Sequence, residues 1–180
     1  FEKNMSQVSA TAGLASDDVK YLSERAKQLG EDIRGANATD IAASYQYLAL
    51  AGQSVGEMYQ TIEPYTKAAI AYGEDQKRVT DLGTDSMSAL RLETEKTSYY
   101  LNVLTKAQNK SNTTATQLME AYIACGGTLA NMNVPIEESA TLLGRMADQG
   151  TKGSEAGNAL NSILVNLMGT TSTTEGALKK

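Results

Sequence analysis

Apolar residues recur along most of the chain at steps of three and four, which is the spacing of an amphipathic α-helix. Val19, Leu22, Ala26 and Leu29 define one such face. Runs of β-branched residues are short, and the chain has only two prolines. The pattern therefore predicts an all-α protein, with helical faces over residues 1–12, 16–30, 39–52, 54–73, 79–90, 100–107, 118–126, 136–147 and 154–168.

Capping residues and glycines mark where these helices begin and end. Ser54 and Glu57 have the spacing of a capping box, while Gly52 and Gly73 follow apolar faces and are typical helix stops. Pro64 predicts a break or kink. We expect a compact multi-helix domain over residues 1–168, with about seven to nine short-to-medium helices joined by glycine-marked turns. The polar residues 169–180 predict a linker or a frayed end.

The stretch from residue 142 to 168 predicts a helical hairpin around a glycine-marked corner. Gly150 stands where a left-handed residue closes the first helix, and Ser154 stands where an N-cap opens the second. Gly157 lacks a side chain and would let another backbone approach closely. A phosphate-binding loop is a second interpretation, but its spacing matches neither the P-loop nor the dinucleotide motif. The residues singled out as a structural motif are Gly150, Lys152, Gly153, Ser154, Gly157 and Leu160.

One internal similarity is visible. Residues 39–52 and 113–126 share a threonine start, an alanine-rich face and a glycine stop. Helices of similar length often agree this well by chance, so we assign neither a duplication nor a solenoid without a sustained period.

Composition narrows the classes of partner. The net charge is −5 and the basic residues are scattered, which disfavours a nucleic-acid groove. No apolar run approaches the roughly 20 residues of a membrane span. Cys125 is the only cysteine, so no intrachain disulfide forms, and burial as a small hydrophobe is its expected role.

Candidate catalytic groups are few. The chain has no histidine, which removes the commonest general base and the commonest zinc ligand, and we expect no metal, cofactor or catalytic residue. Adjacent acids at predicted helix starts fit the helix dipole and do not face each other. Tyrosines at apolar helix positions indicate core or interface roles. The acid pairs are Glu137 with Glu138, Asp17 with Asp18, and Glu74 with Asp75; the tyrosines are Tyr45, Tyr59, Tyr65, Tyr72, Tyr100 and Tyr122.

The whole chain resembles the core region of tail tape measure proteins from long-tailed bacteriophages, the phage-related minor tail protein family. FEKNMSQVSATAG, the helix ending in LALAG and TKAAIAYGED are similar to its landmarks. EESATLLGRMADQGTKGSEAGNALNSILVNL resembles its most recognisable block almost position by position. Asn161 departs from the arginine usual there, which puts any contact of that charge in doubt.

The resemblance implies a structural virion protein that takes part in tail assembly and in setting tail length. The chain would be a fragment of a longer protein, in the tail lumen of the virion and, during assembly, in the host cytoplasm. Implied partners are the tail tube protein, tail assembly chaperones, tail tip or baseplate proteins and further copies of itself, without specific nucleic-acid or membrane binding. Alternatives are a helical adaptor unconnected with phage and, less favoured, a peptidoglycan-lytic domain.

Overall fold

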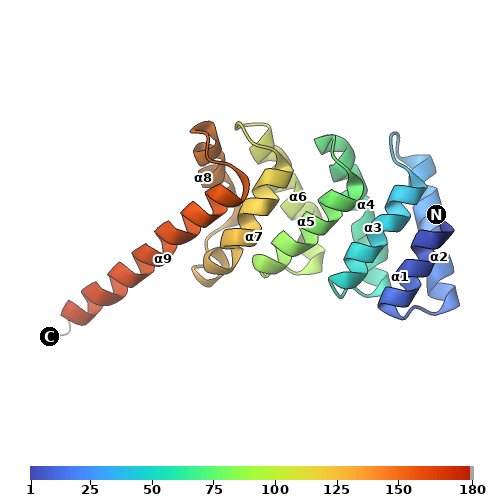
Figure 1. Ribbon diagram of the computed structural model, residues 1–180, viewed down its shortest axis with the longest axis horizontal. Helices are drawn as coiled ribbons and strands as arrows, with labels where there is room; N and C mark the ends of the chain where they lie inside the picture. The colour runs from blue at the N-terminus through green and yellow to red at the C-terminus, as the bar shows by residue number, and fades with distance from the viewer. Residues whose placement is uncertain (179–180) are drawn as a thin grey trace.

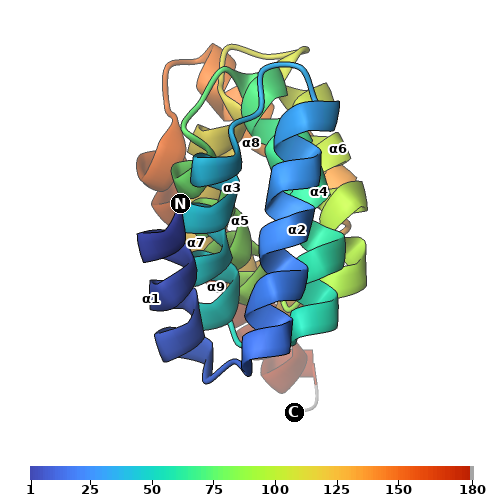
Figure 2. The same ribbon diagram turned by 90° about the vertical axis from the view of Figure 1, so that its right-hand side faces the viewer.

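In the computed structural model, whose described residues are 1–178, the helices form two layers that run side by side. Odd-numbered helices make one layer and even-numbered helices the other, so that each consecutive pair is a hairpin stacked on the next (Figures 1 and 2). The predicted all-α class is confirmed. The odd layer contains α1 (Glu2–Ala12), α3 (Ala38–Leu50), α5 (Gln76–Ala89), α7 (Ala115–Asn131) and α9 (Gly153–Leu178); the even layer contains α2 (Ser16–Asp32), α4 (Val55–Tyr72), α6 (Thr97–Gln108, after a 3₁₀ turn Thr94–Lys96) and α8 (Ile136–Asp148).

Buried positions repeat along the even layer with a constant step. Leu22, Thr61, Tyr100 and Ser139 are all buried and lie 39 residues apart in succession. The same step connects a second buried set, Ala26, Tyr65, Leu104 and Leu143. The odd layer repeats at steps of 38, 39 and 38 from the first residue of α3 to that of α9. The chain therefore has the sustained period of a helical-repeat stack.

This period corrects the register of the internal similarity. The N-caps of α3 and α7 are Asn37 and Thr114, which lie 77 residues apart. The similarity between residues 39–52 and 113–126 has an offset of 74, three residues short. The two helices do hold equivalent places in the stack, and in the structural register Tyr45 corresponds to Tyr122, both fully buried.

Glycines mark several turns, as expected, and other residues take their place elsewhere. Gly13 and Gly52 are left-handed, with φ of 64° and 79°, and Arg91 has the same conformation one period later, with φ of 55°. Asn133 is left-handed after α7, with φ of 53°. The turn geometry is therefore repeated even where its residue type is not.

Some predicted helix ends are wrong because tertiary contacts outweigh local propensity. Helix α7 runs through Gly126 and Gly127 to Asn131, and Gly126 is buried against α5. Pro64 lies inside α4, which runs from Val55 to Tyr72, so of the predicted break or kink the break does not occur. The carbonyl that loses its partner belongs to Gln60, an exposed residue that water reaches.

The ends of α2 and the start of α3 also differ from expectation. Gly30 does not stop α2, which continues to Asp32; a Cβ at Gly30 would lie 2.9 Å from the backbone nitrogen of Ala38. Helix α3 begins at Ala38, before the predicted residue 39, and Asn37 is its N-cap, since the Asn37 side chain accepts a hydrogen bond from the Thr39 amide at 2.7 Å. The predicted capping box of Ser54 and Glu57 is confirmed.

Helix α9 continues where a linker was predicted. Its backbone is helical through Leu178, so residues 169–178 extend the helix, which projects beyond the stack (Figure 1). Residues 179–180 of the predicted linker lie outside the described residues. The division at residue 168 remains a prediction.

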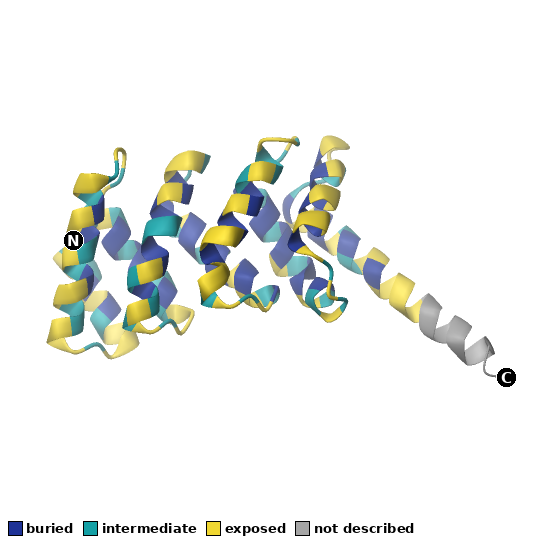
Figure 3. Ribbon diagram, turned by 180° about the vertical axis from the view of Figure 1, so that it is seen from behind, coloured by how far each residue is buried: buried dark blue, intermediate teal, exposed yellow. Residues whose placement is uncertain are grey.

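One apolar core lies between the layers and runs the length of the stack (Figure 3). Cys125 is fully buried, as predicted, and burial raises the pKa of its thiol to about 11. The four tyrosines at the centre are Tyr45, Tyr65, Tyr100 and Tyr122, which confirms their core role, whereas Tyr59 and Tyr72 are half-buried.

Candidate interaction groove between α6 and α8

The corner predicted around residue 150 is present and joins α8 to α9. Gly150 is left-handed, with φ of 96°, and its amide donates to the Ala147 carbonyl at 3.0 Å. The next amide, of Thr151, donates to the Met146 carbonyl at 3.0 Å, which satisfies a second helix-end carbonyl. The conformation that requires glycine at 150 is thus the predicted one.

Gly157 allows α9 to touch the backbone of α7, as predicted. A Cβ at this position would lie 2.3 Å from the Ala121 carbonyl oxygen and 2.8 Å from its Cα. Gly153 is also close, since its Cβ would lie 2.9 Å from an oxygen of Glu120. Leu160, one turn further along α9, is buried in the core. These residues build the α7–α9 contact.

The start of α9 differs from the prediction by one residue. The helix begins at Gly153, so Ser154 lies in its first turn rather than before it, and the Lys152 carbonyl accepts from Ala156 at 3.3 Å. Asn161, which stands where the resemblance has arginine, accepts a hydrogen bond from the Thr128 hydroxyl of α7 at 2.5 Å. A neutral contact between helices thus occupies this position.

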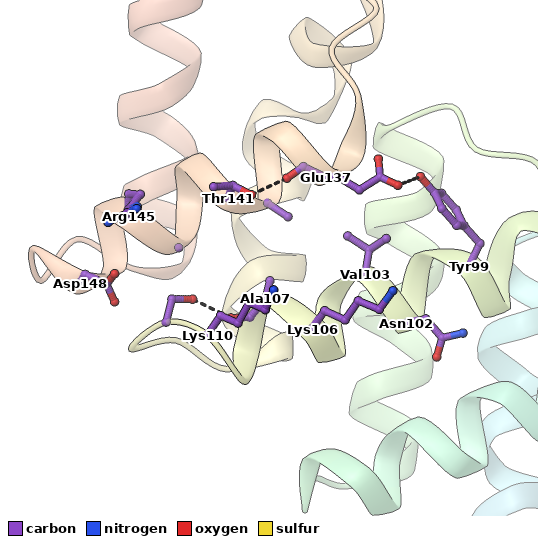
Figure 4. Close-up of a pocket in the computed structure, with 13 residues that line it drawn as sticks. Tyr99, Asn102, Val103, Lys106, Ala107, Lys110, Glu137, Thr141, Arg145 and Asp148 are labelled. Atoms are coloured by element: carbon purple, nitrogen blue, oxygen red, sulfur yellow. Dashed lines mark hydrogen bonds between the residues drawn. The ribbon is translucent and has the colours of Figure 1, made fainter.

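A concave feature lies on the even layer, between α6 and α8 (Figure 4). It has a volume of about 860 Å³, within the range of small-molecule ligand pockets. Val103, Ala107, Ala140 and Gly144 form its floor, and all are apolar or without a side chain. Charged side chains rise on its walls: Lys106, Lys110, Glu137, Arg145 and Asp148.

The two acids of the groove are held by donors from α6 and its following turn. Tyr99 donates its hydroxyl proton to Glu137, and the Asn112 amide donates to Asp148 at 2.8 Å. The hydrogen bond from Tyr99 lowers the pKa of the Glu137 carboxyl, assisted by its own backbone, and the same bond raises the pKa of Tyr99. These two contacts bridge α6 and α8 near the two ends of the groove.

A neighbouring groove between α4 and α6 provides a useful contrast. It has a volume of about 460 Å³ and is lined by Glu63, Lys67 and Asn102, among others. Its lysine is paired, because Lys67 lies 2.6 Å from a Glu63 oxygen. The other oxygen of Glu63 lies 2.5 Å from Arg25 of α2.

Sequence reasoning missed the α6/α8 groove. It singled out Glu137 only as a helix-start acid and treated the basic residues as scattered. The four-residue step from Lys106, near the end of α6, to Lys110, in the turn that follows, was an available signal. Arg145 could not be added to them from the sequence, since its meeting with α6 depends on the stacking. Among the described residues, the acid pairs and Cys125 form no cluster of three that could hold a metal ion, and no helix is long and apolar enough to cross a membrane.

Stacked helical hairpins with a groove on one layer define a helical-repeat scaffold, a class that uses extended surfaces to contact other proteins. Comparison with known families identifies the family of the chain. A match to the family described as "Phage-related minor tail protein" covers residues 23–180. The chain therefore belongs to this family.

Individual relatives carry a more specific name. The chain is 28% identical over 164 residues to the "Tape measure protein" of Pneumococcus phage Dp-1, an alignment that covers 91% of this chain and 14% of that protein. It is also 28% identical over 183 aligned positions to the "Probable tape measure protein" of Escherichia phage P2, covering 100% of this chain and 22% of that protein. The chain thus spans less than a quarter of either relative. No solved structure matches it significantly.

Proposed function

We propose that this chain is a segment of a tail tape measure protein and takes part in tail assembly and in setting tail length. The observation that carries the proposal is the similarity to two tape measure proteins over nearly the whole chain, together with the family match. A periodic stack also suits a long structural protein, because each hairpin contacts only its neighbours and the architecture tolerates extension.

The proposal places the segment in the lumen of the tail tube, with the tube protein, assembly chaperones and tip proteins as partners, and gives it no catalytic role. Self-association is part of the same proposal. The net charge of −5 supports a lumenal position, since a negative surface does not retain DNA that passes it.

The test is an in-frame deletion of this segment in a phage that carries it, with tail length measured by electron microscopy. A segment stretched as continuous helix would shorten the tail by about 270 Å, at 1.5 Å per residue. A segment that keeps its fold would remove only about 50 Å, because the five helices stacked in the odd layer occupy about 10 Å each. A tandem duplication is the matched control and should lengthen the tail by the same amount.

Absence of tails after the deletion would support a role in nucleating assembly rather than in length. Tails of normal length and number after both the deletion and the duplication would contradict the proposal in either form. Stable particles from the duplication would show that the parent tolerates altered chain length.

A further inference from the structure

The α6/α8 groove is positively charged in a protein that is negative overall. Its lining contains three cations, Lys106, Lys110 and Arg145, against two acids, Glu137 and Asp148. The whole chain has 16 basic and 21 acidic residues, so this balance is the reverse of the average. The groove is thus a local basic site with an apolar floor.

The charges of the groove are unequally satisfied. Tyr99 and the Asn112 amide already bind the two acids. The three cations, by contrast, have no acidic oxygen within 4.0 Å among the described residues, where the ion pairs involve other side chains. Lys67 in the adjacent groove is paired at 2.6 Å. The cations of the α6/α8 groove are therefore available for carboxylates from another molecule.

The floor of the groove can accept apolar side chains. Val103 and Ala140 are buried beneath the rim, whereas the Ser111 side chain packs against α8 at Gly144, where a Cβ would lie 2.7 Å from the Ser111 Oγ. An occupant would gain both burial of apolar area and ion pairs at the walls.

The length of the groove suits a short helix. Glu137 accepts its hydrogen bond from Tyr99 near one end of the groove, and Asp148 accepts its hydrogen bond from the Asn112 amide near the other. The two acids stand eleven residues apart on α8, which is about 16 Å at 1.5 Å per residue. About three turns of a helix fill that distance. Helices that dock in grooves do so through apolar side chains at i, i+3 or i+4, and i+7.

We propose that the α6/α8 groove binds an acidic amphipathic helix of a partner protein. Its apolar face packs on Val103 and Ala140, and its carboxylates pair with Lys106, Lys110 and Arg145. The proposal goes beyond the function proposed above, since it assigns a binding site that does not depend on length determination. A nucleic-acid strand fits less well, because Glu137 and Asp148 would repel phosphates at both ends of the groove.

Fluorescence anisotropy with the purified full chain tests the proposal. The probe is a labelled synthetic helix of about four turns, with leucines at i, i+3, i+4 and i+7 and glutamates on both flanks. A second peptide carries lysine at every glutamate position. We expect the acidic peptide to bind at least about tenfold more tightly than the basic one, a ratio that salt should reduce.

Charge reversal locates the binding. The double variant Lys106→Glu/Lys110→Glu should bind the acidic peptide at least about tenfold more weakly than the wild type does. The milder double variant Lys106→Ala/Lys110→Ala should reduce the affinity for the acidic peptide by a smaller factor. Thermal melting of both double variants checks that the loss of binding is not a loss of fold. The matched control, Lys67→Glu, lies in the α4/α6 groove and should leave binding unchanged. Four results would overturn the proposal. The two peptides could bind equally, or both double variants could bind the acidic peptide as tightly as the wild type does. Alternatively, the acidic peptide could fail to bind at all, or single-stranded DNA could displace it.

Discussion

The two layers of the stack are built on different principles. In the odd layer, glycines let helix backbones touch: Gly126 of α7 meets Ala89 of α5, and Gly157 of α9 meets Ala121 of α7. In the even layer, grooves separate the helices, and long polar side chains bridge them, as Arg25 and Glu63 do between α2 and α4. Shape complementarity fixes the odd layer, whereas charge and hydrogen bonds connect the even layer.

The difference shows how one repeat can combine close helix packing in one layer with grooves in the other. Helix spacing depends on the side chains at the contact, so small residues draw the odd layer together. The same hairpins leave room on the other side, where grooves form. We interpret the odd layer as the structural spine and the even layer as the surface for partners.

The largest expected effect comes from closing the space between α7 and α9. Gly157→Ala would place its Cβ 2.3 Å from the Ala121 carbonyl oxygen, so the two helices must separate. We expect a loss of about 3 kcal/mol or more in the free energy of unfolding, measured by urea denaturation. The control is Asn158→Ala, at the adjacent exposed position, which should change stability by less than about 0.5 kcal/mol. Equal effects of the two would contradict a backbone contact at Gly157.

A smaller effect is expected from the clamp of the even layer. Glu63→Gln removes a carboxylate that both Arg25 and Lys67 contact, at a cost of about 1 to 2 kcal/mol at pH 7. The hydrogen bond from Lys67 lowers the pKa of Glu63, so its stabilisation is present above the unfolded pKa and is lost as pH falls through the folded value.

The denaturation difference between wild type and Glu63→Gln should therefore shrink from pH 7 toward pH 3. Glu24→Gln is the control. The Glu24 carboxylate lies 4.0 Å from the Lys20 ammonium, and both side chains are mostly exposed. A pH-independent difference at Glu63 would refute the electrostatic account of this clamp.

Buried hydroxyls that connect the two layers should matter slightly less. Tyr122 of α7 donates to the Ile136 carbonyl of α8 at 3.1 Å, so Tyr122→Phe should cost about 1 kcal/mol. Tyr45→Phe is a matched change, because the Tyr45 hydroxyl is buried without a hydrogen-bond partner in the described structure. Its removal should be neutral or stabilising in thermal melts. The comparison fails if Tyr45→Phe proves as costly as Tyr122→Phe.

The groove cations should contribute least to stability. Lys106, Lys110 and Arg145 are exposed and unpaired among the described residues, so single alanine substitutions should change the unfolding free energy by less than about 0.5 kcal/mol. Chemical denaturation of each variant is the measurement. A loss above about 1 kcal/mol at any of them would make that side chain a structural support rather than a binding residue.

Much of the fold follows from local signals in the sequence. Helical periodicity predicts each helix, and the capping box at Ser54 and the close approach at Gly157 are both present. The local signals fail at Gly126 and Pro64, where a helix continues against its propensities. At Gly126 the packing against α5 offsets the low helix propensity of glycine. That contact cannot be predicted from the sequence of one helix.

The period and the groove could not be predicted for a different physical reason. Burial repeats every 39 residues in the even layer, but leucine, threonine, tyrosine and serine fill equivalent places, as at Leu22, Thr61, Tyr100 and Ser139. The repeat is one of geometry and not of residue type. The groove needs α6 beside α8, and only the stack brings Lys106 near Arg145.

Two adjacent glycines of α7 provide the most direct test of the unequal layers. A Cβ at Gly126 would lie 2.9 Å from the Ala89 carbonyl carbon, whereas a Cβ at Gly127 meets nothing within 4 Å. Both residues are inside one helix, so alanine has the same propensity gain of up to about 1 kcal/mol at each. The measurement is the unfolding free energy of Gly126→Ala and Gly127→Ala. We predict that Gly126→Ala lowers the free energy of unfolding and that Gly127→Ala raises it, so that the two variants differ by about 2 kcal/mol or more. Equal changes in the two variants would contradict a backbone contact as the basis of the odd layer.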